Sequence, residues 1–189
     1  RPRPAGGRRP LPGHGLPVRG ADQVRAVLTD TASLLEHVFA HTLDLMNEGA
    51  TLDTIVHSLE VPSDLAGKPY LQPIYDEPEF VVRNIWRLYG GWYDGNPARL
   101  KPPPDAQLAA EVSTLAGGAR ALAARAQEVA AAGDFRLGCQ LIEWATAADP
   151  DDTEVRGIRH EVYSARVEAE RSLMARGVYT WAAHESASE

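Results

Sequence analysis

From Asp105 onward the chain is rich in alanine and is interrupted only by short turn signals. Glycine readily adopts a positive φ after a helix, and proline cannot continue one, so each signal predicts a helix end. Strands are typified by alternating apolar and polar residues, and this pattern is not found over any useful length of the sequence. The sequence therefore predicts an all-α fold, with a helix end or a kink at Gly117-Gly118 and helix ends at Gly133-Asp134 and Asp149-Pro150.

Residues 120–152, "RALAARAQEVAAAGDFRLGCQLIEWATAADPDD", have the pattern of one tetratricopeptide-like helix pair. Small residues allow two helices to approach closely, Gly133-Asp134 makes the turn, and Asp149-Pro150 closes the second helix. The unit does not recur at a fixed period. An extended solenoid is therefore not predicted.

The first half of the chain also has helical spacing of its apolar residues. Asn47-Glu48-Gly49 is a helix stop, Thr51 or Asp53 can cap the next helix, and Gly90-Gly91 ends a later one. The predicted elements are helices at 21–49 and 51–62, an extended, proline-punctuated segment at 63–76, and a helix at 77–90.

Charge and composition exclude several classes of protein. The net charge of −7 argues against a nucleic-acid partner. No apolar run approaches the roughly 18 residues that cross a bilayer, so no membrane span is predicted. Cys139 is the single cysteine, which rules out a disulfide within the chain and a thiolate zinc cluster. Nothing distinguishes a cytoplasmic, periplasmic or secreted location.

His14 lies between two glycines in "LPGHGLPVRG". Flanking glycines let the backbone turn sharply and leave the imidazole uncrowded, which suits a metal ligand. Zinc needs three or four ligands, however, and no other candidate lies beside His14. Spacing alone favours a histidine in a Gly-Pro loop.

Two further groups of residues could bind a metal or take part in acid–base chemistry, but each has a simpler structural interpretation. His37 and His41 are four residues apart on one helical face, as in zinc proteases, but the glutamate that would act as general base is missing. A packed histidine pair is the favoured interpretation. Asp76, Glu77 and Glu79 lie at the start of a predicted helix, where negative charge is favourable, so capping is favoured over acid–base chemistry.

The loop "YGGWYDGNPARLKPPP", residues 89–104, combines aromatic residues with a strong turn signal at Asp94-Gly95-Asn96-Pro97. Aromatic residues before a turn are usually anchors of a core or an interface. A ligand contact through the tyrosine hydroxyls is the alternative.

The run "YLQPIYDEPEFVVRNIWRLYGGWYDGNPARLKP" resembles the helical dimerisation domain of the alkyl sulfatases, zinc enzymes of the metallo-β-lactamase superfamily. Two later stretches, "LAGGARALAARAQEVAAAGDFRLGCQLIEWATAADPDD" and "VYSARVEAERSLMARGVYTWAAHES", resemble the segment that follows in the same family. The resemblance covers residues 11–186. It implies a domain division of 1–20 as a tail and irregular remnant of the metallo-β-lactamase domain, and 21–189 as the helical dimerisation domain with sub-parts 21–100 and 105–189.

The resemblance also gives His14 a role. "PGHGLPVRG" is similar to the final metal-binding motif of the superfamily, in which the histidine is the last protein ligand of a two-zinc site. The main motif, H-x-H-x-D-H, is absent. We therefore expect that two zinc ions bind in the complete parent enzyme, that this chain alone does not hold them stably, and that it has no sulfatase activity. The chain then corresponds to a truncated gene product or to a piece of a larger enzyme.

In the parent, the resemblance implies hydrolysis of alkyl sulfate esters such as dodecyl sulfate to alcohol and sulfate. Tyr89 and Tyr93 are the candidate substrate-binding residues, with Arg19 and Arg87 as weaker candidates. The resemblance further implies a homodimer, whose anchors in the core or the interface are Phe80, Ile85, Trp86 and Trp92. The alternative is a stand-alone tetratricopeptide-like interaction module without catalysis. An H-x-H-x-D-H motif encoded upstream of Arg1 would favour the enzyme, and a nearby initiator methionine would favour the module.

Overall fold

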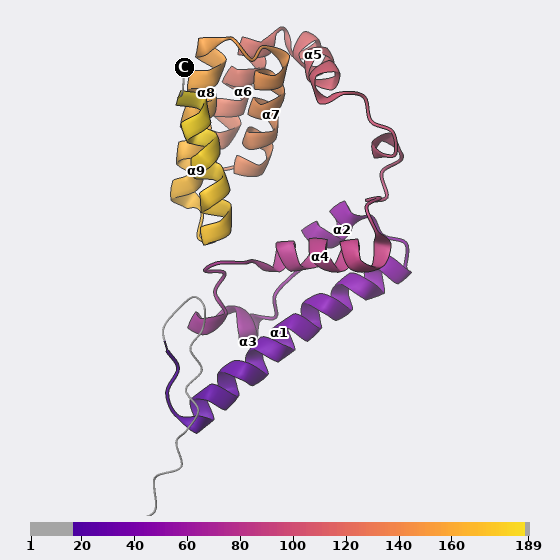
Figure 1. Ribbon diagram of the computed structural model, residues 1–189, viewed down its shortest axis with the longest axis vertical. Coiled ribbons are helices and arrows are strands. Elements are labelled where there is room, and N and C mark those ends of the chain that lie inside the picture. Colours follow the sequence, from indigo (N-terminus) through magenta and orange to yellow (C-terminus); the bar gives the residue numbers. More distant parts are fainter. Residues whose placement is uncertain (1–16, 188–189) are drawn as a thin grey trace, which may run out of the picture. The chain divides into compact units, whose positions relative to one another are not determined.

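The computed structural model describes residues 17–187, and within that range it contains helices and no strand (Figure 1). The all-α prediction is therefore confirmed for this part of the chain, whereas the tetratricopeptide-like detail stays a prediction. The chain divides into two compact units, unit 1 up to Leu100 and unit 2 from Lys101 onward. Unit 1 contains α1 (Ala21–Asn47), α2 (Leu52–Ser58), α3 (Ser63–Ala66), the 3-10 helix η1 (Pro69–Leu71), α4 (Pro78–Gly90) and the 3-10 helix η2 (Pro97–Arg99). Unit 2 contains α5 (Asp105–Ala116), α6 (Ala119–Ala131), α7 (Phe135–Ala148), α8 (Thr153–Ala169) and α9 (Leu173–Ala187).

The core of unit 1 lies where α1, α2 and α4 meet. Its buried residues are Val38 of α1, Ile55 and Val56 of α2, and Val82 and Ile85 of α4. β-Branched residues are stiff and fill such a junction with little loss of rotamer freedom. The Thr51 hydroxyl accepts the backbone N–H of Thr54 and so caps α2, as the sequence predicted.

The segment 63–76 departs from its predicted extended form, because it contains α3 and η1. In the sequence, Pro62 and Pro69 indicated interruptions of helical structure. Each instead lies at the start of a short helix, where a missing N–H costs nothing. The Pro62 carbonyl accepts the N–H groups of Leu65 and Ala66, and the Leu65 side chain is buried. The extended prediction was wrong for these two helices, and burial of Leu65 explains why the first one forms.

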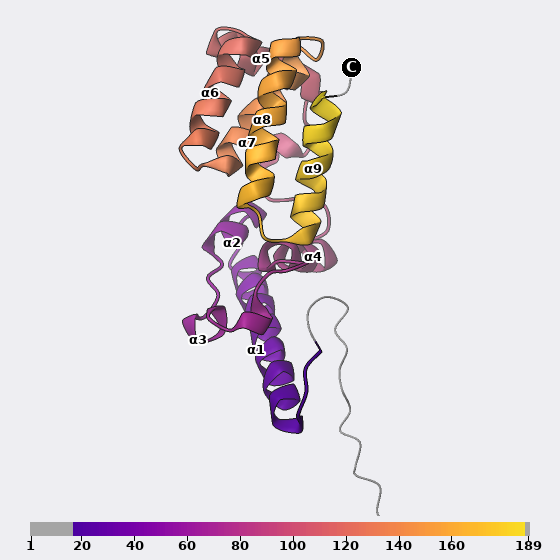
Figure 2. The same cartoon turned by 90° about the vertical axis from the view of Figure 1, so that its left-hand side faces the viewer.

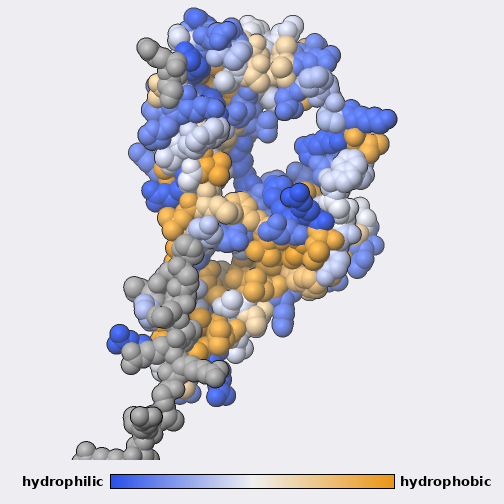
Figure 3. All heavy atoms as spheres, viewed as in Figure 1, coloured by the Kyte–Doolittle hydropathy of each residue, from blue (hydrophilic) through white to orange (hydrophobic). Residues whose placement is uncertain are grey.

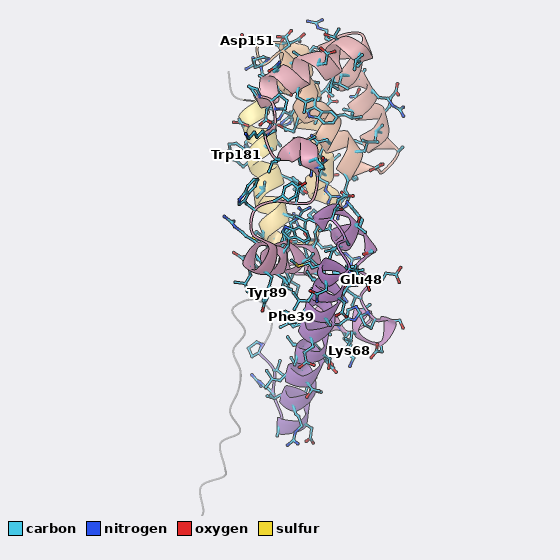
Figure 4. All side chains as sticks on the ribbon, turned by 90° about the vertical axis from the view of Figure 1, so that its right-hand side faces the viewer. Phe39, Glu48, Lys68, Tyr89, Asp151 and Trp181 are labelled. Carbon is cyan, nitrogen blue, oxygen red and sulfur yellow. The ribbon has the colours of Figure 1, made fainter. Side chains whose placement is uncertain are left out.

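A single carboxylate holds this segment against α1. Asp30 accepts hydrogen bonds from the Lys68 ammonium group and from the Tyr70 hydroxyl, each at 2.5 Å. The bond from Lys68, followed by the bond from Tyr70, lowers the pKa of Asp30 below its ordinary value. Lys68, labelled in Figure 4, thus links the segment to α1 with Tyr70.

Unit 2 is a layered helical bundle in which α6 and α7 form a close pair and α8 and α9 run side by side (Figures 1 and 2). Apart from Tyr163, its buried core is built from small and medium residues, which are Leu122, Ala123, Ala126, Ala130, Ile142, Ala145, Val155, Val162, Ala182 and Ala183. Gly138 allows the close approach of α7 to α6. A Cβ atom at Gly138 would lie 2.9 Å from the Ala130 Cβ and 3.1 Å from the Ala126 carbonyl oxygen, so only glycine fits this position.

The helix ends of unit 2 fall at the predicted turn signals. Gly117 ends α5 with φ 89° and ψ 19°, the left-handed conformation typical of glycine after a helix. Asp134 caps α7 by accepting the Leu137 N–H, and Asp152 caps α8 by accepting the N–H groups of Glu154 and Val155. These predictions of the helix boundaries are confirmed.

Candidate functional site: the exposed face of α1 and α4 and the loop after α4

The helix α4 presents the candidate residues of unit 1. It starts with Pro78 in its first turn, and Glu79 pairs with Arg83 one turn later at 2.8 Å. The acidic residues at 76–79 thus lie at a helix start, where the sequence placed them. Ile85 is buried in the core and Phe80 is half-buried, so these two predicted anchors lie on or beside the inner face of α4.

Trp86 connects α4 to the loop that follows it. Its side chain is half-buried against the core of unit 1, and its indole N–H donates to the Tyr93 carbonyl oxygen at 3.0 Å. A buried indole N–H normally finds such a partner. Trp86 therefore acts as a structural anchor within unit 1.

The loop is further held by Asp94. The Asp94 carboxylate pairs with Arg99 at 2.6 Å and accepts the Asn96 N–H, while its backbone carbonyl accepts the Leu52 N–H. The hydrogen bond from Arg99, and then that from Asn96, lowers the pKa of Asp94. These contacts close the turn that the Asp-Gly-Asn-Pro sequence predicted and fix it to the start of α2.

Gly95 is required at the point where the loop touches α2. Its φ is +92°, and a Cβ atom would lie 2.9 Å from the Thr51 Cγ2 atom. The contact borders a cavity of about 490 Å³ that is lined by Thr51, Asp53, Asp94, Gly95, Asn96, Pro97 and Arg99. The Arg99 guanidinium is already paired with Asp94, so the cavity does not present a free cation for an anionic group.

The two candidate substrate contacts differ in exposure. The Tyr89 side chain is 56% exposed and meets the Phe39 ring of α1 edge to face, with ring centroids 5.9 Å apart (Figure 4). The Tyr93 side chain is half-buried and meets the Trp92 ring edge to face at 6.1 Å. The structure therefore divides Tyr89 and Tyr93 between two aromatic pairs, one on the face of α1 and α4 and one in the loop.

Large apolar side chains are unusually exposed on unit 1. Trp92, predicted as an anchor, is 75% exposed, and Leu88, four residues earlier in the chain, is 74% exposed. Figure 3 shows hydrophobic residues gathered over α4 and the adjoining part of α1. The exposed apolar face of unit 1 comprises Leu28, Leu35 and Phe39 of α1 and Tyr89 of α4. Patches of this kind mark interaction sites in soluble proteins.

The described residues do not form a metal site. Across residues 17–187 there is no group of three or more His, Cys, Asp or Glu side chains that could hold a metal ion. His37 Nε2 lies 2.8 Å from the Glu60 carbonyl oxygen, and His41 Nε2 lies near the Ile55 carbonyl and the Ser58 hydroxyl. The pair thus links α1 to α2 and the residues after it, and the structural interpretation of these histidines holds. His14 lies outside the described residues.

Unit 2 contains a buried polar network that was not predicted from the sequence. Arg159 is almost fully buried, pairs with Glu143 at 2.8 Å, and donates to the Ala182 carbonyl and the Ser186 hydroxyl. Its guanidinium also lies over the Tyr163 ring, 5.3 Å from the centroid. Burial raises the pKa of the Tyr163 hydroxyl. The only sequence signal was an arginine on the inner face of a helix, which does not reveal partners on two other helices.

The comparisons with known proteins decide the family. Residues 51–189 match the family model described as alkyl sulfatase dimerisation. The chain belongs to the alkyl sulfatase dimerisation family. It is 34% identical over 150 residues to a linear primary-alkylsulfatase of Pseudomonas sp. (strain ATCC 19151), and 33% identical over 147 residues to an (R)-specific secondary-alkylsulfatase of Pseudomonas sp.. Those alignments cover 79% and 77% of this chain but 28% and 22% of the relatives.

The fold agrees with that membership. The solved structure of the stereoselective inverting sec-alkylsulfatase Pisa1 from Pseudomonas sp. superposes with a TM-score of 0.83 at 30% identity, over 92% of this chain and 28% of that one. The resemblance stated from the sequence is thereby confirmed at the level of the family. The chain spans about a quarter of the length of the alkylsulfatases that it matches. No helix in the described part of the chain is long and apolar enough to span a bilayer.

Proposed function

We propose that this chain is the dimerisation and active-site-capping segment of a zinc-dependent alkyl sulfatase, and that it forms a homodimer. The complete enzyme hydrolyses alkyl sulfate esters to alcohol and sulfate. The observation that supports this most strongly is the match of residues 51–189 to the alkyl sulfatase dimerisation model. The names of the relatives, which are a primary and a secondary alkylsulfatase, support the substrate class.

The zinc ions of the proposed enzyme have no site among residues 17–187, because no suitable group of ligands occurs there. His14, in its Gly-His-Gly motif, is the proposed last protein ligand, and the remaining ligands belong to other parts of the complete enzyme. This chain alone is accordingly expected to be inactive. No catalytic step is assigned to its residues.

Tyr89 and Tyr93 are the proposed contacts for the sulfate ester. A phenol hydroxyl can donate to an anionic oxygen, and hydrogen bonds to charged groups are stronger than neutral ones. The rigid loop supports this role, since the Trp86 and Asp94 hydrogen bonds fix the backbone on which Tyr93 lies. Tyr89 is supported by its exposed position at the end of α4.

Two measurements on the purified chain test the proposal. Light scattering coupled to size exclusion should give twice the chain mass of 20.5 kDa at micromolar concentration. Sulfate release from a short alkyl sulfate should stay at the background rate with zinc added. A monomer at high micromolar concentration would refute the dimerisation role, and zinc-dependent turnover by the chain alone would refute the assignment of the remaining ligands to other parts of the enzyme.

A further inference from the structure

The long helix α1 has an apolar stripe beside the one that it buries in the core of unit 1. Successive members of this stripe are separated by four and three residues in alternation, which is the heptad spacing of helices that pair along a seam. The stripe consists of Leu28, Ala32, Leu35, Phe39, Thr42 and Met46. The stripe that is already packed in unit 1 contains Leu34, Val38 and Leu45.

Only the C-terminal half of the seam is covered by unit 1. Thr42 is fully buried, and Met46 packs against the core beside Gly90 of α4. In the N-terminal half, the side chains of Leu28, Leu35 and Phe39 are 60%, 48% and 40% exposed. Figures 1 and 2 show α1 extending beyond α4 toward its N-terminus. The C-terminal half of the seam is thus packed within unit 1, whereas no helix among the described residues packs on its N-terminal half.

The segment α3–η1 does not cover this half. The segment is held to α1 through Asp30, which accepts hydrogen bonds from Lys68 and Tyr70. Asp30 lies two positions after Leu28, which places it about 200° around the helix from the seam. The exposed stripe and the side of α1 that holds α3–η1 therefore point in different directions.

We propose that the Leu28–Phe39 stripe is a dimer contact that pairs antiparallel with the same stripe of a second copy. This inference rests on the proposed homodimer and names its surface. In the antiparallel register, Leu28 of one copy lies opposite Phe39 of the other, and Ala32 lies opposite Leu35. At the centre of the contact, the large Leu35 side chain of each copy thereby meets the small Ala32 of the other, as close packing of two helices requires.

A second copy is the occupant that the observations favour. A two-fold contact requires a self-complementary surface, and the alternation of Ala32 with Leu35 provides one. Phe39 contacts Tyr89 of α4 edge to face, so an aromatic pair ends the stripe where α4 covers it. Aromatic residues are enriched in the cores of interfaces. The family model described as alkyl sulfatase dimerisation matches residues 51–189, which follow α1 in the chain, and this description supports a second copy of the chain as the partner.

A second exposed stripe provides the control. Met174, Val178 and Trp181 of α9 are also exposed, and Trp181 projects outward in Figure 4. This stripe spans two turns and is followed on the same face by Glu185, whose carboxylate pairs with Arg159. A charge placed at Trp181 should therefore leave a dimer through α1 intact.

The experiment measures the dissociation constant of the full chain by sedimentation equilibrium for the wild type, Leu35→Glu, Leu28→Glu and Trp181→Glu. The side chains of Leu28, Leu35 and Trp181 are 60%, 48% and 62% exposed, and circular dichroism verifies that each variant retains its helicity. We expect Leu35→Glu to raise the dissociation constant about 30-fold or more, Leu28→Glu to raise it by less, and Trp181→Glu to leave it within about threefold.

Disulfide trapping tests the register. A mixture of Ala32→Cys and Leu35→Cys chains, oxidised with diamide, should cross-link between copies more than either chain alone, because residues 32 and 35 face each other only in the antiparallel register. Native Cys139 does not compete at pH 8, since burial raises its pKa to about 11.

The failures of the two proposals are distinguishable. A wild-type chain that remains monomeric would refute the homodimer itself. A dimer that survives both Leu28→Glu and Leu35→Glu would refute the α1 seam while leaving the homodimer intact, and a dimer lost in Trp181→Glu would assign the contact to α9. Stronger cross-linking of Ala32→Cys alone than of the mixture would replace the antiparallel register with a parallel one.

Discussion

The indole N–H of Trp86 donates a hydrogen bond of 3.0 Å to the backbone carbonyl oxygen of Tyr93. This bond joins the last turn of α4 to the loop that follows it, across a chain reversal at Gly91. The half-buried Trp86 ring lies on the core of unit 1, so this side chain attaches the loop to the core, in addition to the hydrogen bond between Asp94 and the start of α2.

Trp86→Phe keeps an aromatic ring but removes this donor. We expect a loss of about 1–2 kcal/mol from the missing hydrogen bond and the smaller ring. Hydrogen exchange of the peptide covering 91–100, followed by mass spectrometry, should accelerate accordingly. Trp92→Phe is the matched control, because Trp92 is largely exposed and its replacement should leave exchange unchanged. Equal acceleration in both variants would contradict the anchoring role of Trp86.

The Asp94–Arg99 pair predicts a pH dependence of the same loop. The folded pKa of Asp94 is depressed by the Arg99 and Asn96 hydrogen bonds, so its stabilising contribution is present above the unfolded value of about 3.9 and is lost as pH falls through the lower folded value. An NMR titration of the Asp94 carboxyl carbon should therefore have its midpoint below 3.8.

Arg99→Met tests the cause of that shift. Without the guanidinium, the midpoint of Asp94 should move upward toward its ordinary value. Arg87→Met is a suitable control, because Arg87 is exposed and does not contribute to the shift of the Asp94 pKa. A midpoint that is the same in the wild type and in Arg99→Met would show that Arg99 is not the cause.

Helix boundaries were the most predictable part of this fold. Gly117, Gly133 and the Asp149-Pro150 pair act through local backbone preferences, which a sequence states directly. The helices α3 and η1 were missed because proline marks both a break and a helix start, and the burial of Leu65 that decides between them depends on the tertiary fold. The roles named from the sequence for Tyr89 and Trp92 stay predictions. The pairing of Tyr89 with Phe39, fifty residues earlier in the chain, could not be inferred from residue spacing.

Arg159→Met removes the centre of the buried network in unit 2 while retaining an unbranched side chain. The Ser186 hydroxyl loses its donor, and the Ala182 carbonyl loses one donor but keeps the hydrogen bond from the Ser186 hydroxyl. Glu143 and Glu185 are partly exposed and can be solvated. We expect unit 2 to lose about 2–3 kcal/mol, measured by urea unfolding. Arg125→Met is the matched control, because the Arg125–Glu128 pair is exposed and should contribute at most about 1 kcal/mol. Similar losses in the two variants would contradict a special role for Arg159.

Gly95→Ala should destabilise unit 1 for two reasons. The positive φ of Gly95 is unfavourable for alanine, and the new methyl group would meet the Thr51 side chain at 2.9 Å. Gly49→Ala separates these effects, because Gly49 of unit 1 also has a positive φ, of 84°, but has nothing within 4 Å of the new methyl group. We expect about 1 kcal/mol for the backbone strain at either position and a further loss of about 1–2 kcal/mol at Gly95, measured by thermal unfolding. Equal midpoints for the two variants would show that the Thr51 contact relaxes without cost.

The close approach of α6 and α7 depends on the absence of a side chain at Gly138. The backbone of α6 occupies the space that any larger residue at this position would need. The separation of α6 and α7 therefore depends on the residue at this one position. In a relative with a larger residue there, the two helices must lie farther apart. Comparing residue 138 across relatives would thus indicate which of them share the spacing of this bundle.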